Sequence, residues 1–353
     1  KLGFNNWYTD KVDLSKTDFN IVRVISVNKN SFVVSNGEKD IYAELTGKFL
    51  FNTDSAIDLP TVGDFVYAQL FDDDTLAIIQ DILPRKSLLK RKAAGKKIDY
   101  QLIAANIDIA IIMQALDSNF NIRRLERYLV IINDNNITPL ILLSKSDLIS
   151  PEEAEEKKKQ IFEILPDAKI FSFSNNNLND IENIKTIFTP HKTYCLLGSS
   201  GVGKTTLLNN LIHQDLYKTQ PIREKDNRGK HTTTRRELII LENGAIIIDN
   251  PGMRELGIIS NESGISSTFG EIDELSDQCK YKDCTHTVEA GCAVLEALER
   301  GEISRERYEN FLKLYKESKY NEMSYVEKRQ KDKKFGKFFN STMKDVKKMK
   351  GRE

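Results

Sequence analysis

Residues 198–205 form a glycine-rich segment of the kind that holds the phosphates of a nucleotide. The segment fits the pattern G-x-x-x-x-G-K-[ST] at every fixed position, with an apolar run before it and a helical pattern after it. Glycines let successive backbone N–H groups surround phosphate oxygens, and the dipole of the following helix favours their negative charge. The residues are Gly198, Ser199, Ser200, Gly201, Val202, Gly203, Lys204 and Thr205, followed by Thr206. We predict that Lys204 pairs with the β- and γ-phosphates and that the Thr205 hydroxyl ligates Mg²⁺.

A short pattern in the middle of the chain has the residue types that select guanine. It follows the apolar run TPLILL and consists of Ser144, Lys145, Ser146 and Asp147. The Asp147 carboxylate can accept hydrogen bonds from guanine N1 and N2, which adenine cannot offer, and Lys145 can cover the base. The pattern resembles the N/T-K-x-D element of GTPases, with Ser144 in place of Asn or Thr. At the end of the next apolar run, we expect the backbone of Ser172 and Phe173 to contact guanine O6.

A third pattern, D-x-x-G, follows the apolar run AIII. In GTPases the Asp of this element, here Asp249, holds Mg²⁺, usually through water, and the Gly N–H, here that of Gly252, reaches the γ-phosphate. The polar stretch GKHTTTRRE lies between this element and the phosphate loop. We expect Thr234 in that stretch to complete the Mg²⁺ shell, with Thr233 as the alternative.

The residue after D-x-x-G is Met253, where many GTPases have a Gln that orients the attacking water. Because a thioether cannot orient water, we expect intrinsic hydrolysis to be slow. His231 is the nearest polar candidate for that role. Our candidate catalytic residues are therefore His231, Lys204 and Thr234.

The order of these elements differs from that of an ordinary GTPase. The guanine element comes 54 residues before the phosphate loop, whereas it ordinarily follows D-x-x-G. The sequence therefore predicts a circularly permuted GTPase domain, in which the site is kept and the chain ends are moved. D-x-x-G then leads directly into the C-terminal part of the chain, so the state of the nucleotide can be transmitted to that part.

Four residues in the C-terminal part have the spacing of a structural metal site. They are Cys279, Cys284, His286 and Cys292. Three thiolates and one imidazole suit tetrahedral Zn²⁺, and four protein ligands leave no open position for water. We expect one structural zinc per chain, which stabilises a segment with little apolar content. The alternative is a reduced cluster of free thiols.

Three regions with different patterns must position these residues. Residues 20–83 alternate apolar and polar positions, with an Asn-Gly turn signal at 36–37, which favours an OB-fold-like barrel of short strands. An SH3-like barrel and an open sandwich are the alternatives. Residues 105–258 alternate strand-length apolar runs with helical patterns, which is typical of a multidomain α/β protein with a mostly parallel sheet. The expected domains are a barrel over 1–85, the permuted GTPase domain over 86–262 and a zinc-binding helical domain with a basic tail over 263–353.

The charge is unevenly distributed, although the 353-residue chain carries 52 basic and 52 acidic side chains. Residues 327–353 hold eleven Lys or Arg but only four Asp or Glu. A second basic stretch contains Arg85, Lys86, Lys90, Arg91, Lys92, Lys96 and Lys97. Such stretches neutralise nucleic-acid phosphates, and a solvated face is the alternative. No apolar run approaches the ~18 residues that cross a bilayer, and no signal peptide is evident. Three of the four Cys lie within 279–292 beside a His, as metal ligands rather than a disulfide framework, so we expect a cytoplasmic protein in a reducing compartment.

The motif order, the barrel and the Cys-Cys-His-Cys spacing together resemble one family. It is the ribosome small-subunit-dependent GTPase A family (RsgA, also called YjeQ), and the resemblance covers nearly the whole chain. The matching stretches are RKSLLKRK, QLIAANID, GSSGVGKTTLLN, GKHTTTRREL, IIDNPGMRELG, CKYKDCTHTVEAGCAV and GCAVLEALERGEISRERYENFLKL. Ser144 departs from the family's usual Asn or Thr.

The resemblance implies a late assembly factor that binds the small ribosomal subunit near its decoding centre, is activated by it and leaves after GTP hydrolysis. The implied partners are GTP, GDP, the small subunit and its rRNA, and the implied cofactors are Zn²⁺ and Mg²⁺. We expect a monomer without a membrane partner. The alternative is a nucleotide-gated rRNA-binding module with negligible turnover, which Met253 favours. A permuted GTPase that acts on the large subunit or on membranes is disfavoured by the zinc cluster and the barrel.

Overall fold

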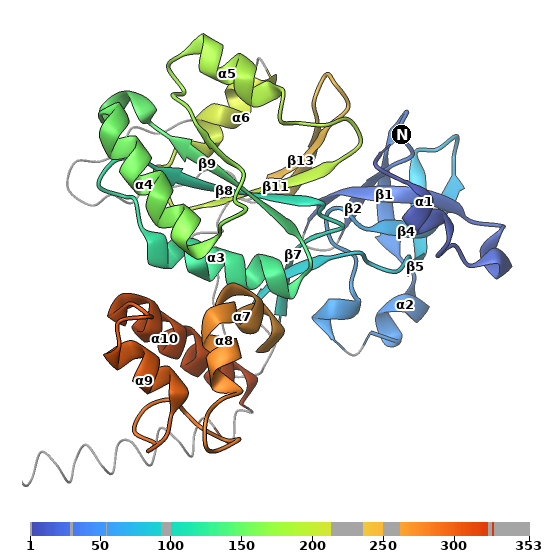
Figure 1. Cartoon of the computed structure of the whole chain (residues 1–353). Helices are drawn as coiled ribbons and strands as arrows, with labels where there is room; N and C mark the ends of the chain where they lie inside the picture. The colour runs from blue at the N-terminus through green and yellow to red at the C-terminus, as the bar shows by residue number, and fades with distance from the viewer. Residues whose placement is uncertain are drawn as a thin grey trace, which may run out of the picture.

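The computed structural model describes residues 2–28, 31–53, 55–92, 100–212, 236–249, 262–323 and 327. Within these ranges the chain forms an N-terminal barrel, a central sheet flanked by helices, and a group of C-terminal helices (Figure 1). In the described part of the chain, no helix combines the length and the apolar composition that crossing a bilayer requires.

The N-terminal barrel is a closed ring of short strands with the order β1-β2-β3-β5-β4. They are β1 (Asn20–Val27), β2 (Phe32–Ser35), β3 (Asp40–Leu45), β4 (Phe65–Phe71) and β5 (Leu76–Ile82). β4 returns to pair with β1, and β3 and β5 run parallel. The closed ring excludes the open sandwich, and the parallel β3–β5 pair matches an OB-fold rather than an SH3-like barrel. The barrel prediction is therefore confirmed.

Short helices flank the barrel strands. They are α1 (Asn6–Thr9), α2 (Gly47–Phe51) and two 3₁₀ turns at Leu14–Lys16 and Ala56–Asp58. The barrel interior is apolar, with Val24, Val34, Ile41 and Ile79 fully buried. Alternate positions along each strand face inward, which is the period that the sequence shows.

The central sheet has the order β10-β9-β8-β11-β13-β12. Its strands are β8 (Ile109–Ala115), β9 (Thr138–Ser144), β10 (Ile170–Ser172), β11 (Thr193–Gly198), β12 (Arg236–Ile240) and β13 (Ile246–Asp249). Neighbours from β10 to β13 run parallel, and β12 is antiparallel to β13. The mostly parallel sheet that the sequence predicts is confirmed.

Helices cover both faces of this sheet, because successive residues of a buried strand point to opposite sides. They are α3 (Ile122–Asp134), α4 (Pro151–Ile164), α5 (Leu178–Lys185) and α6 (Lys204–Ile212), with a 3₁₀ turn at Ser146–Leu148. Ala110 and Ile112 pack toward α3 and α4, whereas Ile111 and Met113 pack toward α5 and α6 (Figure 1).

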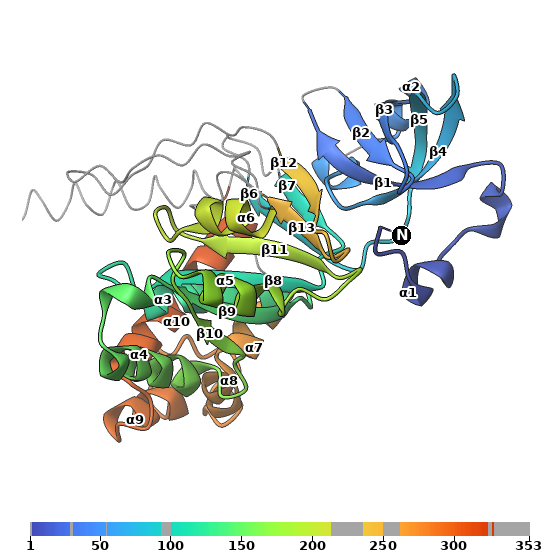
Figure 2. The ribbon, with the colours of Figure 1, turned by 90° about the horizontal axis from the view of Figure 1, so that it is seen from above.

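The barrel is joined to the central sheet by a strand pair and a buried cation. β1 pairs antiparallel with β12, so the two sheets are continuous (Figure 2). Arg23 of β1 is 1% exposed and donates to the carbonyls of Leu2 (2.8 Å) and Gly63 (3.1 Å) and to the Thr193 hydroxyl (3.0 Å). Burial lowers the pKa of Arg23 to about 10, which leaves it charged at neutral pH. Thr193 begins β11, so the barrel is fixed to the strand that leads to the phosphate loop.

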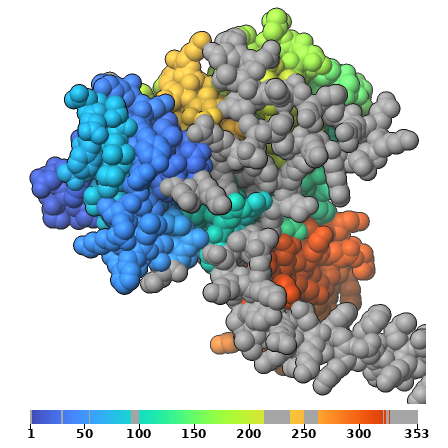
Figure 3. Space-filling view, turned by 180° about the vertical axis from the view of Figure 1, so that it is seen from behind, coloured from blue at the N-terminus to red at the C-terminus, as the bar shows by residue number. Residues whose placement is uncertain are grey.

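The remaining elements are a strand pair and the C-terminal helices. β6 (Leu88–Lys92) and β7 (Tyr100–Ala105) form an antiparallel ribbon. The helices are α7 (Glu262–Thr268), α8 (Gly270–Ser276), α9 (Ala293–Glu299) and α10 (Arg305–Glu322). Seen from behind, the barrel and the C-terminal helices lie on opposite sides of the molecule (Figure 3). The predicted helical character is confirmed for the described residues of this part.

The C-terminal helices share one core with α3. Phe269 and Phe311 belong to the same buried cluster as Leu125 of α3. Gly264 of α7 lies against α3, and a Cβ there would be 2.4 Å from the carbonyl oxygen of Val130. The two helices can therefore approach this closely only because residue 264 has no side chain.

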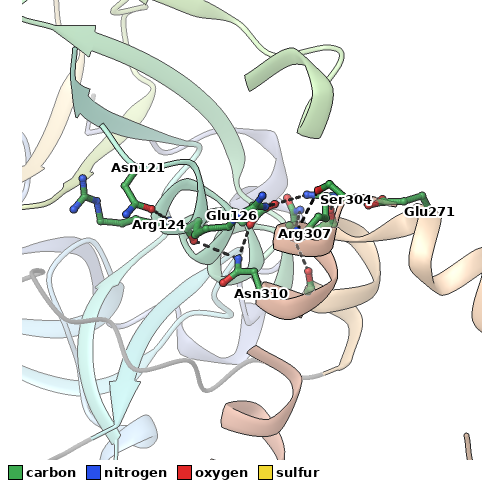
Figure 4. Close-up of polar contacts among 11 residues, drawn as sticks. Asn121, Arg124, Glu126, Glu271, Ser304, Arg307 and Asn310 are labelled. Carbon is green, nitrogen blue, oxygen red and sulfur yellow. Dashed lines mark hydrogen bonds and ion pairs between the residues drawn. The ribbon is translucent and has the colours of Figure 1, made fainter. Parts of the chain in front are cut away.

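A buried carboxylate fixes α10 on α3 (Figure 4). Glu126 has no exposed surface, and its Oε1 accepts hydrogen bonds from Arg123 and Arg307, both at 2.7 Å. Its Oε2 accepts from the Asn310 amide, and Arg307 also donates to the carbonyl of Thr268 at 2.9 Å. A buried charge is tolerated only where donors surround it, so the position of α10 against α3 depends on the Glu126 carboxylate.

Replacing Arg307 by Met removes a charged donor from the buried Glu126. We expect the free energy of unfolding to fall by about 3 kcal/mol, because the carboxylate then stays buried without the charged donor that α10 supplies. Urea titration followed by circular dichroism measures the change. Arg300→Met is the matched control, because its ion pair with Glu302 has both side chains 54% exposed and should contribute little. Equal effects of the two substitutions would contradict the role given to Glu126.

Candidate functional site

The predicted nucleotide elements meet at one edge of the central sheet, where the parallel strands have their carboxyl ends. The strand register places Gly198 beside Met113 and Ser144 beside Ala115. β11 and β13 are also paired in parallel, which brings Asp249 at the end of β13 to the same edge. Ligands of open parallel sheets bind at this edge, so the fold assembles elements that lie far apart in the sequence.

The phosphate loop runs from the end of β11 to the start of α6, as the sequence predicts. Lys204 folds back over the loop, and its Nζ donates to the carbonyls of Gly198 and Ser199, each at 2.7 Å. Gly203 has a φ of +90°, and a Cβ there would lie 2.5 Å from Nδ2 of Asn175. Only glycine therefore fits at this position. A glycine loop at the first turn of a nine-residue helix is suited to bind an anion.

Ser144 supports the phosphate loop through a hydrogen bond to the loop backbone. The side chain is fully buried, and its hydroxyl donates to the carbonyl of Val202 at 2.6 Å. The carbonyl of Gln114 lies further away, at 3.3 Å. A hydroxyl has a single proton, and the short contact assigns it to Val202. Ser144 therefore links the guanine element to the phosphate loop through a protein–protein hydrogen bond.

Lys145 and Asp147 are each held by a partner that the sequence does not single out. Lys145 pairs with Asp117 at 2.7 Å. Burial alone would raise the pKa of Asp117, but the hydrogen bonds from Lys145 and from the Asn119 N–H, together with the charge of Lys145, hold it below its ordinary value. The Ser174 hydroxyl is the main cause that lowers the pKa of Asp147. Asp147 is exposed and stays ionised at neutral pH, as a carboxylate that accepts hydrogen bonds from guanine must.

Ser172 and Phe173, which the sequence assigns to guanine O6, are instead part of the central sheet and its core. The Phe173 side chain is fully buried in the core beneath α5 and α6. Its N–H donates to the carbonyl of Leu143, and its own carbonyl accepts from the N–H of Ser146. Ser172 lies in β10, and its hydroxyl is buried without a hydrogen-bond partner among the described residues. The polar groups next to the loop come two residues later, from Ser174 and Asn175.

The predicted Mg²⁺ ligands are described only in part. Thr205 and Thr206 are half-buried in the first turn of α6, and Asp249 is half-buried at the end of β13. The predicted residues Gly252, Thr234 and His231 lie outside the described residues, as do Thr233 and Met253. The hydroxyl of Thr205 and the carboxylate of Asp249 are oxygen donors at one sheet edge, the chemistry that Mg²⁺ prefers.

The sequence patterns do not single out three polar residues at this edge. They are Asp117, Asn119 and Asn175, whereas Ser174 ends the segment that the sequence assigns to guanine O6. The signal was present, because each of the three follows an apolar run that the sequence identifies as a strand. No motif includes them, and their contacts connect segments up to 81 residues apart. Spacing along the chain therefore gave no reason to select them.

The four predicted metal ligands come together in the C-terminal part. Their ligand atoms all lie within 4.8 Å of one another. His286 Nδ1 is 3.6 Å from Cys279 Sγ and 3.5 Å from Cys292 Sγ, and these two sulfurs are 3.9 Å apart. Tetrahedral zinc with its usual bond lengths requires edges of about 3.8 Å between sulfurs and about 3.6 Å between sulfur and nitrogen. Cys279, His286 and Cys292 therefore have the spacing of a tetrahedral zinc site, and Cys284 Sγ lies within 4.8 Å of each of them.

The surroundings of the cluster favour metal binding. His286 Nε2 lies 3.2 Å from the Ser276 hydroxyl, the outer contact that orients a ligating imidazole. Burial lowers the pKa of His286, which keeps the imidazole neutral and able to ligate. Burial also raises the pKa of the Cys292 thiol to about 12, an effect that a bound cation reverses. The environment therefore prepares His286 for ligation, whereas the Cys292 thiol must lose its proton when a metal binds.

The basic stretch near residue 90 divides into two groups. Arg85 forms a two-pronged ion pair with the buried Asp64, with both contacts at 2.8 Å, and Lys86 pairs with Asp108 at 2.7 Å. Arg85 therefore holds parts of the barrel to one another and is not available to a nucleic acid. Lys86 is exposed, and its surface ion pair leaves it accessible to a partner. Lys90 and Arg91 lie on the β6–β7 ribbon, while Lys96 and Lys97 lie outside the described residues.

Comparison with known proteins agrees with this geometry. Residues 82–259 match the family model of the RsgA GTPase. Small ribosomal subunit biogenesis GTPase RsgA 2 of Listeria monocytogenes is 39% identical over 90% of this chain and 89% of its own length. The protein of the same name from Vibrio parahaemolyticus is 35% identical over 99% of this chain and 93% of its own length.

Solved structures show the same permuted fold. YjeQ from Thermotoga maritima superposes with a TM-score of 0.61 at 27% identity, covering 84% of this chain and 98% of that one. YloQ, described as a circularly permuted GTPase, superposes with a TM-score of 0.60 at 25% identity over 89% of this chain and all of that one. With the nucleotide elements in permuted order along one sheet edge, the chain belongs to the RsgA family of circularly permuted GTPases.

Proposed function

We propose that this GTPase acts in late maturation of the small ribosomal subunit, and that the subunit stimulates its hydrolysis of GTP to GDP and phosphate. The main support is that the permuted nucleotide elements meet at one edge of the sheet. In addition, the curated relatives of this chain are named small ribosomal subunit biogenesis GTPases. We place this activity in the cytoplasm, where reduced thiols can ligate a metal.

The residues at the sheet edge divide the work of binding GTP. Lys204 and the loop N–H groups bind the phosphates, and Thr205 and Asp249 hold Mg²⁺, which supplies charge neutralisation when bound. Asp147 accepts hydrogen bonds from guanine N1 and N2. Asn175 directs a backbone N–H to guanine O6, a role supported by the lack of any partner for that N–H in the described part of the chain. Thr234 and His231 keep their predicted roles in the Mg²⁺ shell and at the attacking water.

The barrel and the C-terminal helices supply the ribosomal contacts in this proposal. Phe51, Tyr42 and Phe71 are exposed on the barrel by 89%, 46% and 40%. Exposed aromatic rings on an OB-fold provide stacking surfaces for unpaired bases. Lys90 and Arg91 on the β6–β7 ribbon and the basic residues after 327 add charge for rRNA phosphates. Structural Zn²⁺ bound by the Cys₃His cluster stabilises the fold of the C-terminal helices and so the surface that they present.

Phosphate release with and without purified small subunits tests the proposal, with large subunits as the control. We expect strong stimulation by small subunits alone, and a loss of about a hundredfold for Lys204→Ala, because one preorganised charged donor at the phosphates is removed. Binding that depends on the nucleotide without any stimulated turnover would instead favour a gated rRNA-binding module.

Exchange of Asp147 for Asn tests the guanine contact. The Asn amide places a donor against the guanine amino group, whereas xanthine carries a carbonyl at that position. We expect the affinity for GTP to fall by about a hundredfold or more and xanthosine triphosphate to bind better than GTP. Equilibrium titration with fluorescent nucleotides measures both. The exposed Asp167→Asn is the matched control, and an unchanged preference for guanine in Asp147→Asn would exclude Asp147 as the selecting residue.

Removal of the metal tests the zinc assignment. We expect one zinc per chain by elemental analysis, which is lost in Cys284→Ser and retained in Cys195→Ala, a cysteine of β11 outside the cluster. Without zinc the C-terminal helices should unfold at a lower temperature while nucleotide binding persists, because the phosphate loop is built by the central sheet. Full zinc occupancy in Cys284→Ser would contradict the assignment.

A further inference from the structure

The segment between β8 and α3 contacts both halves of the nucleotide site, although no motif includes it. Asp117 holds Lys145 of the guanine element at 2.7 Å. Two residues later, the Asn119 amide donates to the Ser199 hydroxyl at 3.2 Å and to the carbonyl of Ser200 at 3.3 Å. One short segment therefore reaches the base side and the phosphate side of the site.

The orientation of the Asn119 amide follows from its other partner. Arg124 donates to Oδ1 of Asn119 at 3.0 Å and also to its backbone carbonyl. A guanidinium can only donate, so the amide oxygen must face Arg124 and the amide nitrogen must face the phosphate loop. The N–H of Asn119 in turn donates to Asp117 Oδ1 at 2.9 Å. The side chain is thus held at both ends before any ligand arrives.

The base of the segment is equally fixed. Gln114, which is fully buried, exchanges two hydrogen bonds of 3.0 Å with the backbone of Asn121. Asn121 then caps α3 by accepting from the N–H of Arg124 at 2.9 Å (Figure 4). Glu126 lies on the same helix, α3, and binds Arg307 and Asn310 of α10. Asn119 is therefore supported by a helix that cannot shift without breaking buried polar contacts.

Anchoring the carbonyl of Ser200 has a consequence for the loop. The carbonyl of one residue and the N–H of the next belong to one planar trans peptide and point in opposite directions. Holding the Ser200 carbonyl outward therefore turns the N–H of Gly201 away from Asn119. Ser144 holds the carbonyl of Val202 in the same way. It thereby also fixes the direction of the Gly203 N–H, which belongs to the same peptide. These N–H groups are the ones that a phosphate-binding loop must present together.

We propose that Asn119 is a positioning residue for GTP and GDP binding. It fixes the Ser200–Gly201 peptide so that the loop is preorganised for phosphate, and Arg124 in turn fixes Asn119. This inference rests on the proposed nucleotide site and goes beyond it by assigning a residue outside every nucleotide motif. Ser144 and Asn119, from two different strand ends, then orient two peptides of the same loop.

Asn119→Asp separates positioning from simple structural support. The aspartate keeps the size of the side chain and its contact with Arg124, but its second oxygen cannot donate and repels the carbonyl of Ser200. We expect GTP and GDP to dissociate about three to ten times faster, as for the loss of one or two hydrogen bonds, with an unchanged unfolding temperature. Stopped-flow measurement with fluorescent nucleotides gives the rates. Asn179→Asp, an exposed position on α5, is the matched control.

Arg124→Met provides a second test if the aspartate destabilises the chain. It leaves the amide in place but frees it to rotate, so we expect a smaller acceleration in the same direction. Wild-type rates in both variants would overturn the inference while leaving the proposed function intact. A wild-type protein that binds no guanine nucleotide would overturn the proposed function, and this inference with it.

Discussion

The arrangement of the molecule depends on helix α3 and on the buried charge that it carries. Glu126 lies without solvent between α3 and α10, where an ionised carboxylate is tolerated only if donors surround it. Those donors come from α3 itself and from α10. Because Arg307 and Asn310 must both reach one carboxylate, the C-terminal helices can pack against the central domain in only one position, which we call the seat of these helices. The closely packed Gly264 reinforces this seat from α7.

This seat connects the nucleotide site with the C-terminal helices by two routes. One route is the chain itself, because D-x-x-G lies shortly before α7 in the permuted order. The other route runs through space, from the phosphate loop through Asn119 and Arg124 to α3 and then to α10. In a chain of the ordinary order, the residues after D-x-x-G would instead continue into β8 and α3. Permutation thus gives the C-terminal helices a covalent link to D-x-x-G while α3 keeps its place under the sheet.

The barrel is attached to the opposite side of the sheet by a different kind of contact. Arg23 is buried among neutral acceptors from the barrel and from β11. Within the barrel itself, the half-buried Arg85 pairs with the buried Asp64. Arg85, a cation that looks available for RNA in the sequence, is therefore structural, whereas Lys86 stays exposed. The rRNA contacts that we propose come from residues that project from the barrel and from the β6–β7 ribbon. The distribution of charge along the chain overestimates the basic surface, because sequence does not report which charges are already paired.

The sequence by itself determined the local elements and the chemistry that each can perform. The phosphate loop, the guanine element, the permuted order and the Cys₃His set are contiguous or closely spaced patterns, and their residue types are fixed by the groups they bind. The barrel and the parallel sheet were also predictable, because a strand buried on one face and a strand buried on both faces leave different periodicities. Tertiary structure decided which residues support these patterns. Ser144 bonds to a loop carbonyl 58 residues away, Phe173 is taken by the core so that Ser174 and Asn175 face the site, and Asn119 meets a loop 81 residues further along. Such contacts depend on strand order and register, which arise only when the whole sheet forms and which no local pattern encodes.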